Sequence, residues 1–399
     1  MSPKRRSPAV LVVLCGIVAA LHIGKMPPAI PVLGEALGVT LVQAGFLLSM
    51  VQLAGMLAGV LVGVAADSVG LRRSVLLGLA LLALASFTGV WVERPFQLLF
   101  LRGLEGLGFL LVVLPSPSLI RRLVPPSRLS LYLGLWGTYM ATGTSLALVG
   151  WPLAMTVVGW QGWWVLLALA TLAMLALAAW RIPADTPCSP ERTAPIAPTQ
   201  AWWQRLHLTL SRRGPWLVAL AFAMYSSQWL AVIGFLPAIY AQAGIGGQLA
   251  GLLTAGACLA NVTGNIAAGR LLHSGFKAHH LMYFAFVTMG ICTFLAFGEL
   301  VGNAPVLRYV AVVLFSSIGG LIPGALFSMA VHVAPNEHTV STTVGWMQQC
   351  SSTGQFIGPP LVAWLAASTG GWQWTWLLTG AASLTGLLLA SKLREPPPR

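Results

Sequence analysis

Twelve long apolar segments divide this 399-residue chain and constrain its fold more than any other feature. Each segment is about 20 residues or longer, which is the length that an α-helix needs to cross a hydrocarbon core of ~30 Å. The bilayer offers the backbone no hydrogen-bond partners, so such segments must form helices. The predicted fold class is therefore an all-α integral membrane protein. The predicted spans are 9–33, 41–65, 74–92, 96–123, 129–157, 162–180, 215–241, 248–271, 279–299, 306–332, 339–367 and 373–391.

Charged residues are scarce, and their placement indicates an orientation in the membrane. Only 8% of residues are charged and 57% are apolar, whereas a soluble domain carries roughly a quarter of charged residues. Of the 22 Lys and Arg residues, all but Lys25, Arg94, Arg102 and Arg308 fall in tails and loops of one side. By the positive-inside rule that side is cytoplasmic, and it holds both termini. We therefore expect the basic residues behind the net charge of +13 to interact with inner-membrane lipids and not with nucleic acid.

The two halves of the chain repeat each other. The string GWQGWWVLL begins at Gly159 and GWQWTWLL begins at Gly371, while Gln43 and Gly59 recur at one constant offset as Gln248 and Gly264. Six-plus-six parallel repeats with a solute site between the halves are typical of transporters. The predicted organisation is a six-helix bundle over 1–180, a cytoplasmic linker over 181–213 that includes an interfacial amphipathic helix, and a second six-helix bundle over 214–399.

The loop after the second span, GVAADSVGLRRS, resembles the signature loop of the major facilitator superfamily. The resemblance implies twelve transmembrane helices arranged as two pseudo-symmetric six-helix bundles, rocker-switch alternating access and a functional monomer. It also implies that this loop is a conformational latch on the cytoplasmic side. Ser68 stands where the family has an arginine, so one partner of the latch network is missing. The latch residues are Gly63, Asp67, Gly70, Arg72 and Arg73.

The fourth span contains FLRGLEGLGF, which looks like the Arg-x-x-Gln-Gly-x-Gly motif of the same superfamily. Arg102 and Glu105 are three residues apart, so they share one helix face and are expected to form an ion pair. A charged side chain at this depth in the membrane costs free energy unless it is paired or faces a polar cavity. A function is therefore the first explanation to consider for such a residue. In proton-coupled relatives the arginine controls protonation of a nearby acid, which makes Arg102 and Glu105 the proton-coupling candidates. The alternative is a purely structural pair.

The strings GWMQQCSSTGQFIGPP, LPSPSLIRRLVPP and GWQGWW resemble the cyanate/nitroimidazole permease branch of the superfamily. The superfamily resemblance covers essentially the whole chain, and it implies that the first, fourth, seventh and tenth spans line a central path with help from the fifth and eleventh. The polar residues of those spans are the substrate-binding candidates. They are His22, Lys25, Tyr139, Tyr225, Gln228, Trp229, Gln348, Gln349 and Gln355.

The charges on these helices favour an anionic solute. Two cations, Lys25 and Arg102, stand against one acid, Glu105, so the expected cavity is net positive and attracts anions. We therefore expect a secondary active transporter of a small carboxylate-like or cyanate-like anion, coupled to protons or working as a uniporter. The alternative for Lys25 is that its long stem snorkels to the outer interface.

Two other functions are compared with anion transport by what each requires of the sequence. A proton-coupled exporter of a neutral drug or nitroaromatic compound is the main alternative. A membrane-embedded enzyme would need a nucleophile or metal cluster, but the chain has only 9 acidic residues and no His/Glu/Asp metal set. We therefore expect no catalytic residue, metal or cofactor.

Overall fold

The computed structural model describes residues 8–59, 70–185, 202–299, 304–336 and 339–393, and every regular element in these ranges is helical. The helices of the first half are α1 (Pro8–Gly24), α2 (Met26–Leu37), α3 (Leu41–Ser49), η1 (Met50–Gln52), α5 (Leu71–Thr88), η2 (Gly89–Trp91), α6 (Pro95–Val113), α7 (Ser116–Leu123), α8 (Pro126–Gly137) and α9 (Tyr139–Arg181). After α10 (Trp202–Leu210), the helices of the second half are α11 (Arg213–Gln242), α12 (Gly247–His273), α13 (Ala278–Phe297), α14 (Pro305–Gly319), α15 (Leu321–Val333), α16 (Val340–Thr369) and α17 (Thr375–Ser391).

Within the described residues the predicted spans are confirmed as helices, and several of them are broken; residues 60–65 of the second span lie outside the described part. The first span consists of α1 and α2, with Lys25 at the break, and the fourth and tenth spans are each two consecutive helices. The fifth and sixth spans lie mainly in α9, which turns at Gly159, where φ is 68°. In the described part of the chain, 9 helical stretches are long and apolar enough to cross a membrane, and α17 is a shorter apolar helix.

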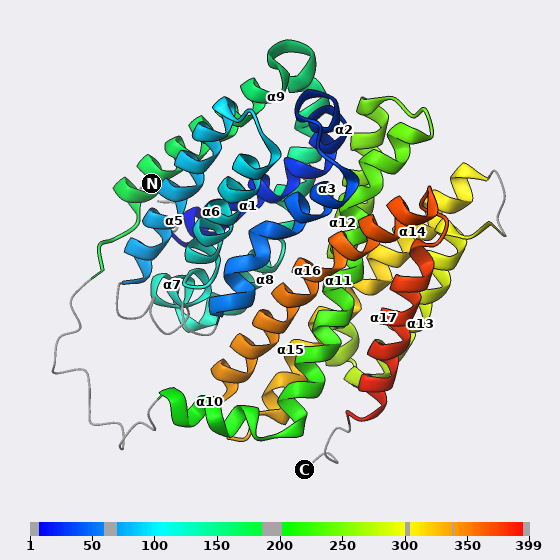
Figure 1. Cartoon of the computed structure of the whole chain (residues 1–399). Helices are drawn as coiled ribbons and strands as arrows, with labels where there is room; N and C mark the ends of the chain where they lie inside the picture. Colours follow the sequence, from blue (N-terminus) through cyan, green and yellow to red (C-terminus); the bar gives the residue numbers. More distant parts are fainter. Residues whose placement is uncertain (1–7, 60–69, 186–201, 300–303, 337–338, 394–399) are drawn as a thin grey trace, which may run out of the picture.

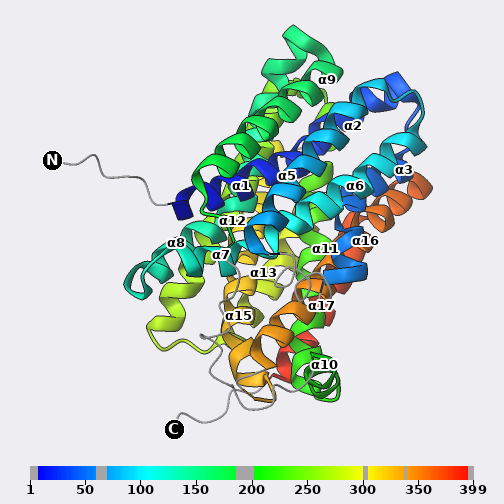
Figure 2. The ribbon, with the colours of Figure 1, turned by 90° about the vertical axis from the view of Figure 1, so that its left-hand side faces the viewer.

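Two groups of helices make up the molecule, and they meet along one interface. In Figure 1 the N half (α1 to α9, blue to green) lies above and to the left of the C half (α11 to α17, green to red), and Figure 2 shows the same division from the side. An even number of spans returns the chain to the side on which it began. We name that side the terminal side and the opposite one the far side.

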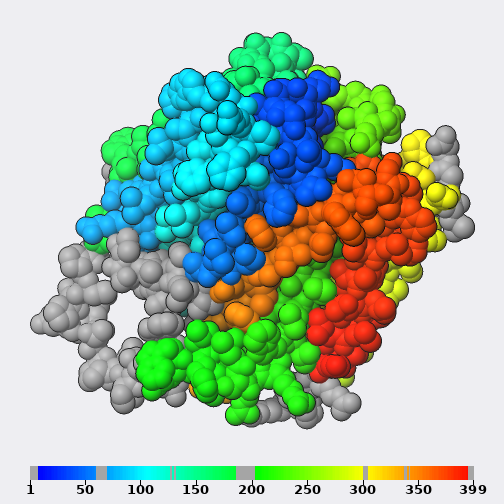
Figure 3. All heavy atoms as spheres, viewed as in Figure 1, coloured from blue at the N-terminus to red at the C-terminus, as the bar shows by residue number. Residues whose placement is uncertain are grey.

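Contacts between the halves run from the middle of the membrane to the far side. Helix α3 packs along α16, visible in Figure 3 as blue atoms against orange ones, and α9 packs along α12. The Ser145 hydroxyl donates to the carbonyl of Ala255 at 3.3 Å, and the Gln52 amide donates to the Gln355 side chain at 3.1 Å. The halves are therefore joined at their middle and their far side.

The helix predicted inside the linker is present as α10. It is anchored to the C half, because the indole N–H of Trp216 donates to the carbonyl of Leu210 at 2.9 Å. The Trp216 ring also packs edge-on against Trp346 of α16, with 4.8 Å between ring centroids. Helix α10 is therefore attached to the C half, next to the start of α16.

Candidate functional site

Four polar side chains form a buried charge cluster inside the N half: His22, Lys25, Arg102 and Glu105. None is more than 1% exposed. The Glu105 carboxylate accepts a hydrogen bond from the Lys25 ammonium through Oε1, and its Oε2 lies 2.5 Å from Nη1 of Arg102. The ion pair expected between Arg102 and Glu105 is therefore present, and Lys25 is a second cation on the same acid.

Main-chain and hydroxyl groups from neighbouring helices hold the charge cluster in place. Arg102 donates from Nη1 to the carbonyl of His22 at 2.8 Å and from Nε to the carbonyl of Leu47 at 3.0 Å. Lys25 donates to the Ser86 hydroxyl of α5 at 3.1 Å, and its ammonium lies 4.7 Å from the centre of the Trp164 ring. Buried ions persist only with such a set of partners.

The snorkelling alternative for Lys25 is wrong. The Lys25 side chain lies inside the N half, where it is 0% exposed and contacts Glu105 and Ser86. Glu105 lies 80 residues away in the sequence and supplies the partner that the surrounding segment lacks. The Lys25 ammonium already forms an ion pair with Glu105 and a hydrogen bond to Ser86. It therefore does not need the polar groups of the membrane surface as partners.

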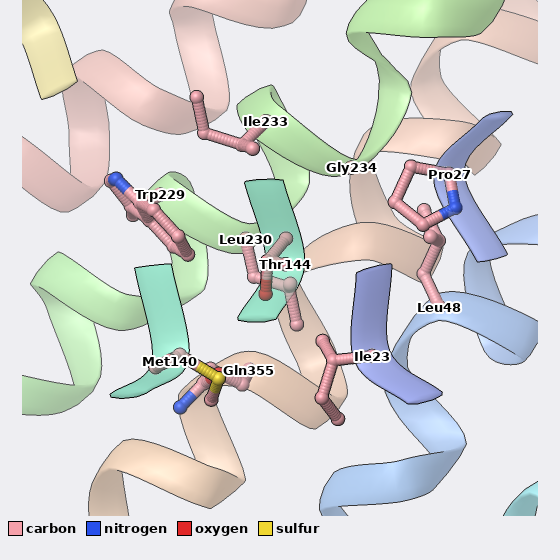
Figure 4. A pocket seen from close by; sticks show the side chains of 10 residues that line it. All are labelled: Ile23, Pro27, Leu48, Met140, Thr144, Trp229, Leu230, Ile233, Gly234 and Gln355. Carbon is pink, nitrogen blue, oxygen red and sulfur yellow. The ribbon is translucent and has the colours of Figure 1, made fainter. Parts of the chain in front are cut away.

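Two adjoining pockets lie between the halves, next to the charge cluster. Both pockets are narrow in this conformation, with cavity volumes of about 10 Å³ for the central pocket and about 60 Å³ for the terminal-side pocket. The central pocket, drawn in Figure 4, is lined by Ile23, Pro27, Leu48, Met140, Thr144, Trp229, Leu230, Ile233, Gly234 and Gln355. The terminal-side pocket is lined by Val51, Gln52, Gly55, Gly59, Gly106, Phe109, Leu110, Val113, Leu114, Tyr139, Met140, Gln348, Ser351, Ser352 and Gln355. Met140 and Gln355 line both, so the two pockets follow one another along a single route.

One helix separates the charge cluster from the central pocket. Ile23 and Pro27 line the pocket, whereas His22 and Lys25 on the same segment point into the N half. Counted formally, two cations and one carboxylate leave one positive charge in excess. Of the described residues that line either pocket, none is charged. The described walls of the two pockets are therefore neutral, with a positive charge behind one of them.

The predicted substrate residues fall into three groups. Gln355 lines both pockets, Trp229 lines the central one, and Tyr139 and Gln348 line the terminal-side one. His22 and Lys25 belong to the charge cluster. The remaining candidates, Tyr225, Gln228 and Gln349, line neither pocket among the described residues.

The candidates away from the pockets have structural partners. The Tyr225 hydroxyl accepts from the side chain of Asn261 at 2.8 Å, and the Gln228 side chain accepts from the Ser383 hydroxyl at 2.9 Å, both inside the C half. The Gln349 amide donates to the carbonyl of Met56 at 2.9 Å, so it links α16 to the second span.

Sequence reasoning did not single out Thr144, Gln52 and Ser351 as pocket residues. A lone amide in an apolar span, such as Gln52, is a signal that could have been used, because polar side chains at this depth need a partner or a cavity. Thr144 carries no such signal, because the hydroxyl of a helical threonine can donate a hydrogen bond to a backbone carbonyl one turn earlier in the same helix.

The predicted latch loop is only partly described, because Gly63 and Asp67 lie outside the described residues. At the end of the loop, Gly70 has a φ of 102° and leads into α5. The first backbone amides of α5 contact a carboxylate that is far away in the sequence. The backbone N–H groups of Arg72 and Arg73 each donate to Asp185 at 3.1 Å. A carboxylate at this position satisfies amides that the helix leaves unpaired and complements its dipole.

Comparisons with known proteins agree with this architecture. The family model described as Major Facilitator Superfamily matches residues 12–352. The chain is 26% identical over 402 residues to the cyanate transport protein CynX of Escherichia coli K12, covering 98% of this chain and 97% of that protein. It is 27% identical over 351 residues to the 2-nitroimidazole transporter of the same organism, covering 87% and 84% of the two chains.

Solved structures share the fold. A D-xylose–proton symporter superimposes with a TM-score of 0.76 at 16% identity, covering 96% of this chain and 97% of that one. A bacterial homologue of the human lysosomal transporter Spinster, in an inward-facing and unoccupied conformation, superimposes with a TM-score of 0.74 at 13% identity, covering 98% and 96%. At such identities the likeness concerns the fold alone.

Proposed function

Since this chain belongs to the Major Facilitator Superfamily and is a multi-pass membrane transporter rather than an enzyme, we propose that its solute is a small anion of carboxylate or cyanate type. The observation that carries the proposal is the excess positive charge of the buried cluster beside the central pocket. One relative is a cyanate transport protein, which agrees with this substrate class.

The size of the electrostatic effect supports a selective role. A helix with its side chains is about 10 Å across, and a unit charge at ~10 Å with an effective dielectric of ~20 contributes between 1 and 2 kcal/mol, roughly tenfold in affinity. The charge acts through the helix wall, so His22, Lys25, Arg102 and Glu105 need not touch the solute. The contacts would come from Tyr139, Trp229, Gln348 and Gln355, which line the pockets.

Alternating access would proceed by rocking of the two halves about these pockets. The contacts described here join the halves from the far side to the level of Gln349 and Met56, beside the terminal-side pocket. The route to the central pocket would therefore run through the terminal-side pocket once the contact between Gln349 and Met56 opens. With basic loops on the cytoplasmic side of the inner membrane, the terminal side is the cytoplasmic one. In the opposite state, the loop with Gly63, Asp67, Gly70, Arg72 and Arg73 would latch the cytoplasmic side.

Proton coupling through Arg102 and Glu105 is part of the proposal. A proton on Glu105 would remove the negative charge that both Lys25 and Arg102 contact, and it would leave two unpaired buried cations. Protonation of Glu105 would therefore increase the positive charge behind the pocket when an anion enters. Proton and anion would then travel together; a uniport would leave uptake independent of a pH gradient.

Export of a neutral compound is the second candidate. The walls of both pockets carry no charged side chain among the described residues, and Trp229 offers an aromatic ring. A 2-nitroimidazole transporter is among the relatives. For such a solute the charge cluster would serve the structure of the N half and would not affect affinity.

Transport by charge variants in proteoliposomes separates the two candidates. Lys25→Met leaves Arg102 and Glu105, so the net charge of the cluster falls from +1 to zero. Lys25→Met/Glu105→Gln leaves Arg102 as the single ion, so the net charge returns to +1. For anion transport, the KM for labelled cyanate should rise roughly tenfold in the single variant and return toward the wild-type value in the double variant. The KM for 2-nitroimidazole should change in neither. Thermal unfolding and size-exclusion profiles show whether each variant is folded, and an unchanged cyanate KM in the folded single variant would rule out the anion proposal.

A further inference from the structure

The hydroxyl of Thr144 is an unpaired polar group at the centre of the molecule. Thr144 is 4% exposed, lies on α9 and lines the central pocket, and its Oγ1 has no hydrogen-bond partner among the described residues. Figure 4 shows this oxygen pointing into the space between the labelled side chains, which come from both halves.

Buried threonines elsewhere in the chain behave differently. Each of five others donates its hydroxyl to the carbonyl four residues earlier on its own helix; they are Thr171, Thr254, Thr293, Thr343 and Thr379. A hydroxyl left without a partner in the interior costs free energy comparable to a lost hydrogen bond. Thr144 therefore carries a cost that these five threonines avoid.

The backbone of Thr144 is fixed where α9 crosses α1. A Cβ on Gly24 would lie 2.5 Å from the Thr144 carbonyl oxygen and 2.7 Å from its Cα, so only glycine permits this approach. The close crossing holds Thr144 against the segment that also contributes Ile23 and Pro27 to the pocket. The hydroxyl is thus presented from a rigid position.

Other polar groups around the central pocket already have protein partners. The indole N–H of Trp229 donates to the Ser316 hydroxyl at 3.1 Å, so Trp229 offers only the surface of its ring. The amide of Gln355 accepts from Gln52 at 3.1 Å and donates to the Ser351 hydroxyl at 3.3 Å. Thr144 is the lining residue whose hydrogen-bonding capacity is entirely unused among those described.

We propose that the Thr144 hydroxyl donates a hydrogen bond to an acceptor atom of the transported solute, and that this solute is small and flat and lies against the Trp229 ring. The inference rests on the proposed function in one respect, which is that the solute binds between the halves. It does not depend on the charge of the solute, because an anion and a neutral nitro or carbonyl compound both carry acceptor atoms. The second N–H of Gln355 lies on the same route and would bind the solute during entry.

Thr144→Val tests the inference, because valine keeps the shape and removes the hydroxyl. For whichever of cyanate and 2-nitroimidazole the wild type binds, the Kd should rise about fivefold, as expected for one lost hydrogen bond. Thr144→Ser keeps the donor and should bind as the wild type does. The matched control is Thr293→Val, a buried threonine whose hydroxyl bonds only to its own helix.

Thermal unfolding of the solute-free protein gives a second readout that a purely structural role would not produce. Since the unpaired hydroxyl is destabilising, Thr144→Val should raise the Tm while it weakens binding, whereas Thr293→Val should lower the Tm. An unchanged Kd in Thr144→Val, an equal rise in Thr293→Val, or failure of the wild type to bind either probe would overturn the inference. Tight binding of 2-nitroimidazole with no binding of cyanate would overturn the anion proposal alone.

Discussion

The two halves share an architecture but bury different polar chemistry. In the N half the interior holds ions, with Glu105 between Lys25 and Arg102. In the C half the buried groups are amides and hydroxyls, such as Gln228 with Ser383. Among the described residues, every fully buried charged side chain lies in the N half. The described residues of the C half therefore show that this architecture can be built with neutral buried polar groups.

The largest expected effect is the removal of one member of the charge cluster. Arg102→Met leaves Glu105 with one cation and two carbonyl groups without their donor, and it should destabilise the protein by about 3–5 kcal/mol. The double variant Lys25→Met/Glu105→Gln keeps Arg102 and should lose much less than the sum of its single variants. Thermal unfolding in detergent measures both. If the double variant loses as much stability as the two single variants together, the ions do not act as one cluster.

A smaller loss is expected at the equivalent depth of the C half. Gln228→Met leaves the Ser383 hydroxyl without its side-chain acceptor and should cost about 1–2 kcal/mol, the usual value for a neutral buried partner. The KM for the transported solute should stay within twofold, because Gln228 lines neither pocket among the described residues. A larger rise in KM with an unchanged Tm would place Gln228 in contact with the solute.

The turn that leads into the third span offers a further test. In the N half, Asp185 accepts from the first amides of α5, which the N-cap residue Gly70 has no side chain to satisfy. Asp185→Ala should cost about 1 kcal/mol and Asp185→Asn only part of that. Glu93→Ala, at an exposed carboxylate, is the control and should leave the Tm unchanged.

An effect of similar size, on the conformational balance and not on unfolding, is expected at the contact that joins the halves. Gln349→Leu removes the hydrogen bond to the carbonyl of Met56 and should shift the balance between conformations by about 1 kcal/mol, close to fivefold. Spin labels at Arg121 of α7 and His332 of α15, in a background without native cysteines, report the separation of the halves. Thr353→Val, which removes a bond within α16, is the control and should leave the distance distribution unchanged.

Span positions and family could be predicted because both depend on local sequence. Apolar length identifies a transmembrane helix wherever it falls, and the Arg102–Glu105 pair follows from helical spacing. The partner of Lys25 could not be predicted, since Glu105 reaches it only through the packing of α6 against α1. The charge count was right in sign, but the charges lie behind the pocket wall and not on it.

Thr144 shows a second limit of sequence reasoning. Its type and its helical setting are the same as those of Thr171 on the same helix, whose hydroxyl bonds to Leu167. What distinguishes Thr144 is the close crossing at Gly24 and the empty space beside it, and both depend on helices far away in the sequence. A missing hydrogen bond leaves no pattern in the residues themselves.

The turn at Gly159 gives α9 a mechanical consequence. Its first limb carries Thr144 in the pocket wall, and its second limb carries Trp164 and Thr171, which touch Lys25 and His22 of the charge cluster. The Trp163 ring packs against Gly150 across the turn, so the limbs lie side by side. A single residue, Gly159, joins them. We therefore expect a tilt of the pocket wall to displace the second limb as well, and with it the side chains that contact the buried ions.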